Sequence, residues 1–97
     1  MADPAQEEIL TGTIRRRDDV LYRVGVDFLA IARVDGYSLT LTGPGASIWE
    51  ILQGPMTGGS VVSVLAEEYE VPHETVACDI GPVLERMVSE GFLDVTP

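Results

Sequence analysis

Five residues, Tyr37-Ser38-Leu39-Thr40-Leu41, alternate apolar and polar side chains. This period of two places Tyr37, Leu39 and Leu41 on one face of a strand, which is typical of a sheet packed on one side only. Two similar segments precede it, at 20–24 and 28–33, and both are rich in β-branched or aromatic residues. Asp35-Gly36 favours a two-residue hairpin between the last two, because both central positions of such a turn need positive φ. The sequence therefore predicts three antiparallel strands, with a weaker candidate at 14–17.

Helical spacing begins directly after the turn Thr42-Gly43-Pro44-Gly45. Ile48, Ile51 and Leu52 share a stripe that Gly54-Pro55 ends, which predicts a helix over about residues 45–53. Ser60 is the candidate N-cap of a second helix that extends to about residue 70.

A third helix over about residues 74–90 follows the break at Val71-Pro72-His73. Its apolar stripe ends at Gly91, and 92–95 is too short for more than a closing strand or extended tail. Gly81-Pro82 interrupts the stripe, so we expect a kink or break near 78–82. Three strands followed by three helices predict an α+β fold with a winged helix-turn-helix-like plan.

Length and charge narrow the possible functions. Ninety-seven residues describe one domain, with an acidic segment at 1–8 that we expect to be a flexible tail and a folded domain over 9–97. The net charge of −10, with Arg as the only cation besides one His, argues against nucleic acid as a partner. Arg15-Arg16-Arg17 is largely neutralised by Asp18-Asp19, so its expected role is solubility.

Enzymatic and metal-site residues are sparse. One cysteine, Cys78, and one histidine, His73, cannot complete a structural zinc site, and their spacing does not place them on one helical face. We expect a half-buried Cys78 and a His73 near a helix start, with no catalytic residue, no metal and no cofactor. Neither a signal peptide nor a membrane span is evident, so the expected location is the cytoplasm.

The motif Leu39-Thr40-Leu41-Thr42, leading into Ile48-Trp49 and Gly54, resembles the PqqD-like family of precursor-peptide recognition elements. Gly91-Phe92-Leu93 resembles the end of that family's third helix, and the likeness spans about residues 20–95. Leu41-Thr42 departs from the Leu-Asn that is usual before the first helix.

The resemblance implies a non-catalytic protein that binds the leader of a ribosomally made precursor. Similar stand-alone chains serve lasso-peptide maturation and deliver the leader to a leader peptidase and a cyclase. An extended leader would add to the third strand, with its side chains in a groove against the third helix. The resemblance implies a leader that often contains Tyr-x-x-Pro, and the acidic side chains beside the helix stripe would attract a basic one. The residues expected to bind it are Tyr37, Ser38, Leu39, Thr40, Leu41, Val76, Asp79, Ile80, Val83 and Met87.

Simpler roles remain open for these residues. Periodic apolar side chains are normally core, so only one edge of the helix stripe should face a ligand. Tyr37, Leu39 and Leu41 are expected in the core too, so the third strand should contribute mainly through its backbone. Trp49 is expected to anchor the helix–sheet interface. Asp79 would steer a basic leader or simply be solvated.

Other functions and products also remain open. The alternatives are an acidic adaptor for another protein and, disfavoured by eight acids against one Arg over 60–97, a DNA-binding regulator. The product could be a lasso peptide, another ribosomal peptide or a quinone cofactor.

Overall fold

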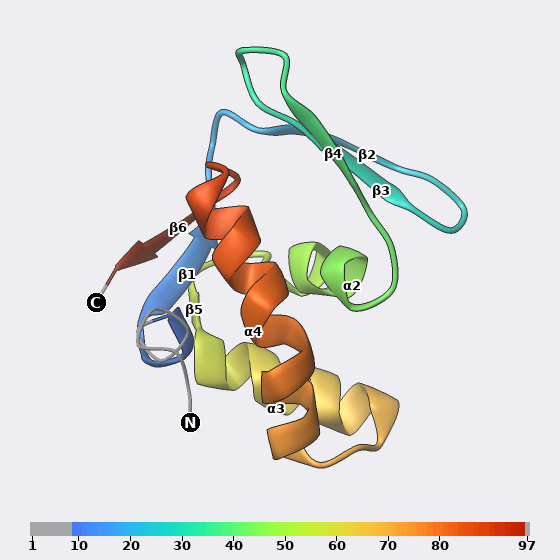
Figure 1. Ribbon diagram of the computed structural model, residues 1–97, viewed down its shortest axis with the longest axis vertical. Coiled ribbons are helices and arrows are strands. Elements are labelled where there is room, and N and C mark those ends of the chain that lie inside the picture. The colour runs from blue at the N-terminus through green and yellow to red at the C-terminus, as the bar shows by residue number, and fades with distance from the viewer. Residues whose placement is uncertain (1–8, 97) are drawn as a thin grey trace.

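The computed structural model describes residues 9–96, so the predicted tail over 1–8 lies outside it. Two three-stranded antiparallel sheets and the helices between them make up the fold (Figure 1). The predicted α+β class is confirmed, although one sheet had been expected.

The first sheet contains the three predicted strands. Its order is β2 (Leu21–Val24), β3 (Leu29–Ala32) and β4 (Ser38–Leu41). Leu21 pairs with Ala32, and Ala32 pairs with Ser38, so both connections are antiparallel hairpins. Gly36 has a φ of 92° in the second hairpin, as predicted. The predicted two-residue turn is wrong, because Asp35 does not have a positive φ and the Arg33 amide bonds to the Tyr37 carbonyl, which leaves a three-residue loop over 34–36.

A second sheet, which the sequence did not reveal, joins the two ends of the domain. Its central strand is β1 (Thr13–Arg16), flanked by β5 (Met56–Thr57) and β6 (Leu93–Thr96). Thr13 pairs with both Thr57 and Thr96. These strands have two to four residues and distant partners, so local periodicity carries little signal for them. The weak strand candidate at 14–17 and the closing strand at 92–95 are confirmed.

Three helices lie between β4 and β6, namely α2 (Pro44–Ile51), α3 (Gly58–Tyr69) and α4 (His73–Ser89). The N-cap of α3 is Thr57, whose side chain accepts a hydrogen bond from the Ser60 amide, so the prediction of Ser60 as the cap is wrong. A cap at Thr57 lets α3 begin three residues earlier, at the end of β5.

The helix α4 continues through Pro82, and the predicted break is therefore wrong. Proline removes the amide that would bond to the carbonyl of Cys78, four residues earlier. Cys78 and Pro82 are both exposed, so this carbonyl lies on a side of the helix that water reaches. Hydration of the carbonyl offsets part of the lost bond. The exposure of Cys78 also corrects its expected half-buried position.

The hydrophobic core lies where α4, α2 and α3 meet the two sheets. Trp49 is 1% exposed and packs edge-on against Tyr22, with 5.6 Å between ring centroids, which confirms its predicted place in the core. The Arg16 guanidinium lies 4.8 Å from the Trp49 ring and donates to the Trp49 carbonyl. Arg16 therefore ties β1 to α2, a structural role in place of the expected contribution to solubility. Arg17 does pair with Asp19, at 3.1 Å.

Candidate functional site

The outer strand β4 presents a row of backbone groups at its free edge. The Arg33 amide donates to the Tyr37 carbonyl at 2.9 Å, and antiparallel pairing alternates from there. Residues 37, 39 and 41 therefore bond inward to β3, whereas the N–H and C=O groups of Ser38 and Thr40 point outward. On the other side of β3, the 2.8 Å bond from the Gly25 amide to the Phe28 carbonyl gives the same alternation.

This edge is available for another strand. Within residues 9–96, β3 is the one strand that pairs with β4, and Ser38 and Thr40 are both exposed. An unpaired strand edge is a template for an additional strand, because its outward amides and carbonyls have no partner in the sheet. An extended peptide could bond to both residues without displacing any element of the fold.

A groove of about 350 Å³ runs between β4 and α4. Its β4 wall ends in Thr42 and the start of α2, and its opposite wall is the C-terminal half of α4. The lining residues are Leu39, Thr40, Leu41, Thr42, Pro44, Gly45, Asp79, Pro82, Val83, Arg86 and Met87. In Figure 1, β4 passes above α2 while α4 runs up toward the same sheet. The groove and the free edge of β4 thus share one strand.

Six of the ten predicted peptide-binding residues line this groove: Leu39, Thr40, Leu41, Asp79, Val83 and Met87. Val76 and Ile80 line a second cavity of about 240 Å³ at the N-terminal half of α4. Ser38 lies outside both linings and contributes its outward backbone groups. The ten residues are therefore divided between the groove, the second cavity and the strand edge, with Tyr37 apart from all three.

Tyr37 instead joins β4 to the end of α4. Its hydroxyl donates to the Glu90 carboxylate at 2.9 Å, and its ring lies 5.9 Å from that of Phe92. The Arg33 guanidinium lies over the same ring at 4.6 Å and also donates to the Glu90 carbonyl at 2.6 Å. Tyr37 is 38% exposed, so its expected place in the core is wrong. It secures one end of β4 against α4.

Burial along α4 agrees with the expectation that one edge of its stripe is accessible. Val76, Ile80 and Met87 are buried, whereas Val83 is half-buried. The floor of the groove is thus continuous with the core, and Val83 is the most open to a ligand of the four apolar α4 residues that were predicted. On β4, Leu41 is buried and Leu39 is half-buried, which gives the opposite wall a similar apolar surface.

Sequence reasoning missed several lining residues, including Pro82 and Arg86 on α4 and Pro44 at the start of α2. Helical spacing could have found the first two, since residues 79, 82, 83 and 86 share one face of a helix. The predicted break at Pro82 concealed this continuity. Pro44 gave no local signal, because its place beside α4 depends on tertiary packing.

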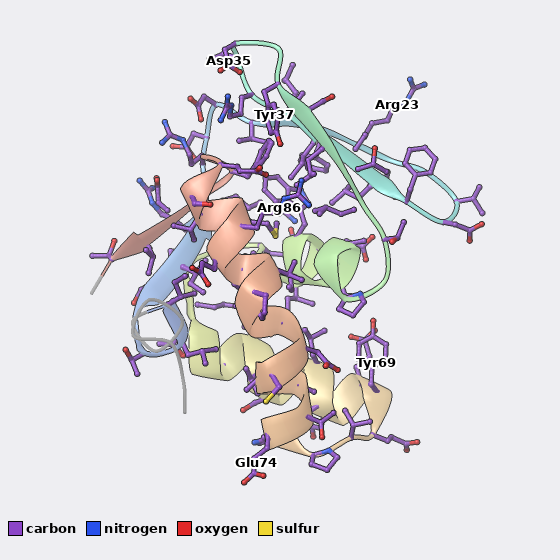
Figure 2. The ribbon with its side chains drawn as sticks, viewed as in Figure 1. Arg23, Asp35, Tyr37, Tyr69, Glu74 and Arg86 are labelled. Carbon is purple, nitrogen blue, oxygen red and sulfur yellow. The ribbon has the colours of Figure 1, made fainter. Side chains whose placement is uncertain are left out.

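The groove carries one charge of each sign on α4, Asp79 and Arg86. Arg86 donates to the Glu90 carboxylate at 3.2 Å, and Figure 2 shows it in the half of α4 that lies nearest Tyr37. The pKa of Arg86 is raised above its ordinary value, first by the neighbouring Tyr37 side chain and then by Glu90. The groove is therefore polar at its rim, with an anionic and a cationic position seven residues apart on one helix.

The described residues contain no group of three or more His, Cys, Asp or Glu side chains arranged to hold a metal ion. His73 is the first residue of α4, and neither it nor Cys78 lines the groove. Over the same part of the chain, no helix combines the length and apolarity needed to cross a bilayer. The arrangement is an apolar groove beside a free strand edge, which suits the binding of an extended peptide.

Comparison with known proteins gives a consistent result. A family model described as coenzyme PQQ synthesis protein D (PqqD) matches residues 28–93. No curated protein matches the chain. A solved structure of TbiB1 in complex with the TbiA(beta) leader peptide is similar, with a TM-score of 0.73 and 22% identity, covering 82% of this chain and 94% of TbiB1.

The solution structure of the PqqD part of Methylobacterium extorquens PqqCD, a stand-alone recognition element for ribosomally synthesized and post-translationally modified peptides, is also similar. Its TM-score is 0.71 at 15% identity, with 84% of this chain and 88% of that chain covered. At these identities the two structures establish a shared fold.

Proposed function

Because the chain belongs to the PqqD family of peptide recognition elements, we propose that it binds the leader segment of a ribosomally made precursor at the edge of β4. The observation that carries this proposal is the coincidence of two features on one strand. The outward backbone groups of Ser38 and Thr40 lie beside a groove walled by Leu39, Leu41 and Val83. Either feature alone is common on small domains.

The strand edge and the groove would have different roles in recognition. Hydrogen bonds to the β4 backbone depend little on leader sequence, because every residue except proline carries the same groups. Alternate side chains of the added strand would point into the groove, where its apolar walls favour aliphatic or aromatic residues. Backbone pairing would therefore supply affinity and register, and the groove would supply selectivity.

The test is fluorescence-polarisation binding of a labelled synthetic leader peptide, taken from the precursor gene nearest to the gene for this chain. We expect saturable binding at micromolar concentration or tighter in moderate salt. A scrambled peptide of the same composition is the matched control and should bind at least tenfold more weakly. Equal binding of both peptides, or no binding of either, would overturn the proposal.

We propose further that the bound leader belongs to a lasso-peptide precursor and is delivered to a leader peptidase and a cyclase. The likeness to TbiB1, which was solved in complex with a leader peptide, supports the binding of a leader. The lasso class rests on the resemblance of the sequence motifs. Such a meeting would take place in the cytoplasm, where precursors are made, and the exposed free thiol of Cys78 suits a reducing compartment.

An exposed apolar surface on the β2–β3 hairpin suits the docking of such an enzyme. Leu21 is 74% exposed and Val26 is 97% exposed, and Val24 lies between them on the same hairpin. This hairpin forms the edge of the sheet opposite β4, so a protein bound there would leave the β4 edge open.

Replacement of Leu21 and Val26 by Ser tests this delivery role. We expect the double variant to bind the leader peptide normally and to lose most of its stimulation of leader cleavage by the peptidase encoded nearby. Undiminished stimulation would contradict docking at the hairpin, and impaired leader binding would show that the hairpin belongs to the peptide site.

A further inference from the structure

A proline stands inside the helix α4, at a position that lines the groove between β4 and α4. Pro82 is the one proline within this helix, and it is exposed. Proline is the least favourable residue in the interior of a helix, because it has no N–H and its ring crowds the carbonyl four residues earlier. Residues that break such a local rule occur mainly at functional sites. The position of Pro82 therefore indicates a role in the groove.

Gly81 explains how the helix accepts this proline. A proline ring clashes with the Cβ of the residue before it, which disfavours a helical backbone there. Gly81 has no Cβ, so this clash does not arise. The helix α4 continues from His73 to Ser89 as one element (Figure 1). The Gly81-Pro82 pair thus keeps α4 continuous while it removes one amide from the hydrogen-bond ladder.

The missing amide leaves the backbone carbonyl of Cys78 without its helical partner. Each C=O of an α-helix bonds to the N–H four residues later, and for Cys78 that residue is Pro82. The carbonyl points along the helix toward the proline ring, which lies on the lining of the groove. Its neighbour Asp79 lines the groove as well. The helix therefore offers a backbone acceptor at the rim of the groove, which a complete ladder would not offer.

This part of α4 lies across the groove from the Leu41 end of β4. A Cβ built at Gly45 would lie 3.3 Å from the Leu41 side chain and 3.6 Å from that of Val83. Leu41 and Val83 therefore meet over the start of α2, and Val83 directly follows Pro82. The end of β4 and the proline are thus brought to the same end of the groove.

A bound leader would have an unpaired backbone donor at this end. Successive residues of an antiparallel strand direct their backbone groups to alternate edges. Leader residues opposite Ser38 and Thr40 would bond to β4, so the residue opposite Leu41 would direct its N–H away from β4. An N–H that leaves water without finding an acceptor weakens binding. The side of the groove that this N–H faces is the one that α4 forms.

We propose that the Cys78 carbonyl, freed by Pro82, accepts a hydrogen bond from the backbone N–H of the leader residue opposite Leu41. This inference rests on the proposed leader binding and adds a second attachment of the leader backbone, to α4 as well as to β4. Every residue except proline carries this N–H, so the contact fixes the position of the leader across the groove without requiring a particular side chain.

Two substitutions of Pro82 separate the carbonyl from the proline ring. Pro82→Ala and Pro82→Val both restore the amide, which would bond to the Cys78 carbonyl within the helix, and valine also keeps an apolar side chain in the groove. Both variants should bind the labelled leader at least about threefold more weakly. Both should unfold at a higher urea concentration, because α4 regains a hydrogen bond. Cys78→Ala keeps the backbone carbonyl and is the matched control, which should bind like the wild type.

Leaders with a single N-methyl group identify the donor. The methyl group is moved through the paired segment one residue at a time. At one position, expected opposite Leu41, it should weaken binding to the wild type at least about threefold. The same peptide should lose much less affinity for Pro82→Val, whose Cys78 carbonyl is already bonded. Methylation opposite Ser38 or Thr40 should weaken binding to both proteins equally, and alanine at the sensitive position should leave the effect of Pro82→Val unchanged.

The outcomes separate this inference from the proposed function. If both Pro82 variants bind the leader like the wild type, or if Pro82→Ala alone weakens binding, the carbonyl is not an acceptor, and strand addition at β4 stands. If the effects of N-methylation and of Pro82→Val multiply at every position, or if one leader side chain accounts for the effect of Pro82→Val, a backbone N–H is not the donor and the inference is wrong. If the wild type binds no leader, both proposals fail.

Discussion

Proline at Thr40 is a sharp test of strand addition, because the amide that it deletes points out of the sheet. The Thr40 N–H faces the free edge of β4, so its loss removes no hydrogen bond to β3. Thr40 is also exposed, so the substitution empties no core space. The variant should therefore fold, at the modest cost of fixing φ near −65° in a strand.

The expected effect on binding comes from the leader carbonyl that loses its hydrogen-bond donor. A leader carbonyl that paired with the Thr40 amide would be enclosed at the β4 edge without a donor. An unsatisfied group of this kind costs about 1–3 kcal/mol, which corresponds to a loss of affinity of about 5- to 150-fold. Thr40→Ala keeps the amide and should change the affinity less than about twofold.

The assay is leader binding by fluorescence polarisation, with thermal unfolding as a check of the fold. Val24→Pro is the matched control. Val24 is likewise exposed, and its amide points outward from β2, at the opposite edge of the same sheet. It should bind the leader like the wild type. Equal affinities of Thr40→Pro and Thr40→Ala, in variants that both fold, would refute strand addition at β4.

Three further predictions concern stability and electrostatics. Gly58→Ala should lower the free energy of unfolding by about 1–3 kcal/mol, because an added Cβ would lie 2.5 Å from the Leu10 Cα. Gly59→Ala is the control and should leave this free energy nearly unchanged, because its Cβ would have no neighbour closer than 3.8 Å. Urea titration measures both. The hydrogen bond from Arg33 lowers the pKa of Asp35 in the folded protein. The ionised Asp35 therefore stabilises the fold above the pKa that it has in the unfolded chain, and this stabilisation is lost as the pH falls through its pKa in the folded protein. The difference in Tm between the wild type and Asp35→Asn should therefore shrink in acid, and a constant difference would contradict this role. Asp79→Asn should slow association with a basic leader by up to about fivefold in low salt and leave dissociation nearly unchanged, as stopped-flow fluorescence would show.

The positions of the predicted site residues show which features of the site the sequence could not predict. The period of two in 37–41 identified β4, yet it could not say which amides point outward, because that depends on the pairing with β3. The bond between the Arg33 amide and the Tyr37 carbonyl settles the alternation and selects Ser38 and Thr40. Likewise, the stripe of α4 was clear from its spacing, but its division between the groove and the second cavity depends on how α2, α3 and β4 pack against α4.

Local patterns determined most of the elements of this protein: the hairpins, the strand-to-helix transition after Leu41 and the amphipathic stripe of α4. These features arise from the period of a strand or helix and from turn residues, which act over a few neighbouring positions. Tertiary structure alone decided the second sheet, the continuity of α4 through Pro82 and the packing of Arg16 against Trp49. Each depends on contacts between segments far apart in the chain, or on which side of a helix faces water, and neither is encoded in local spacing.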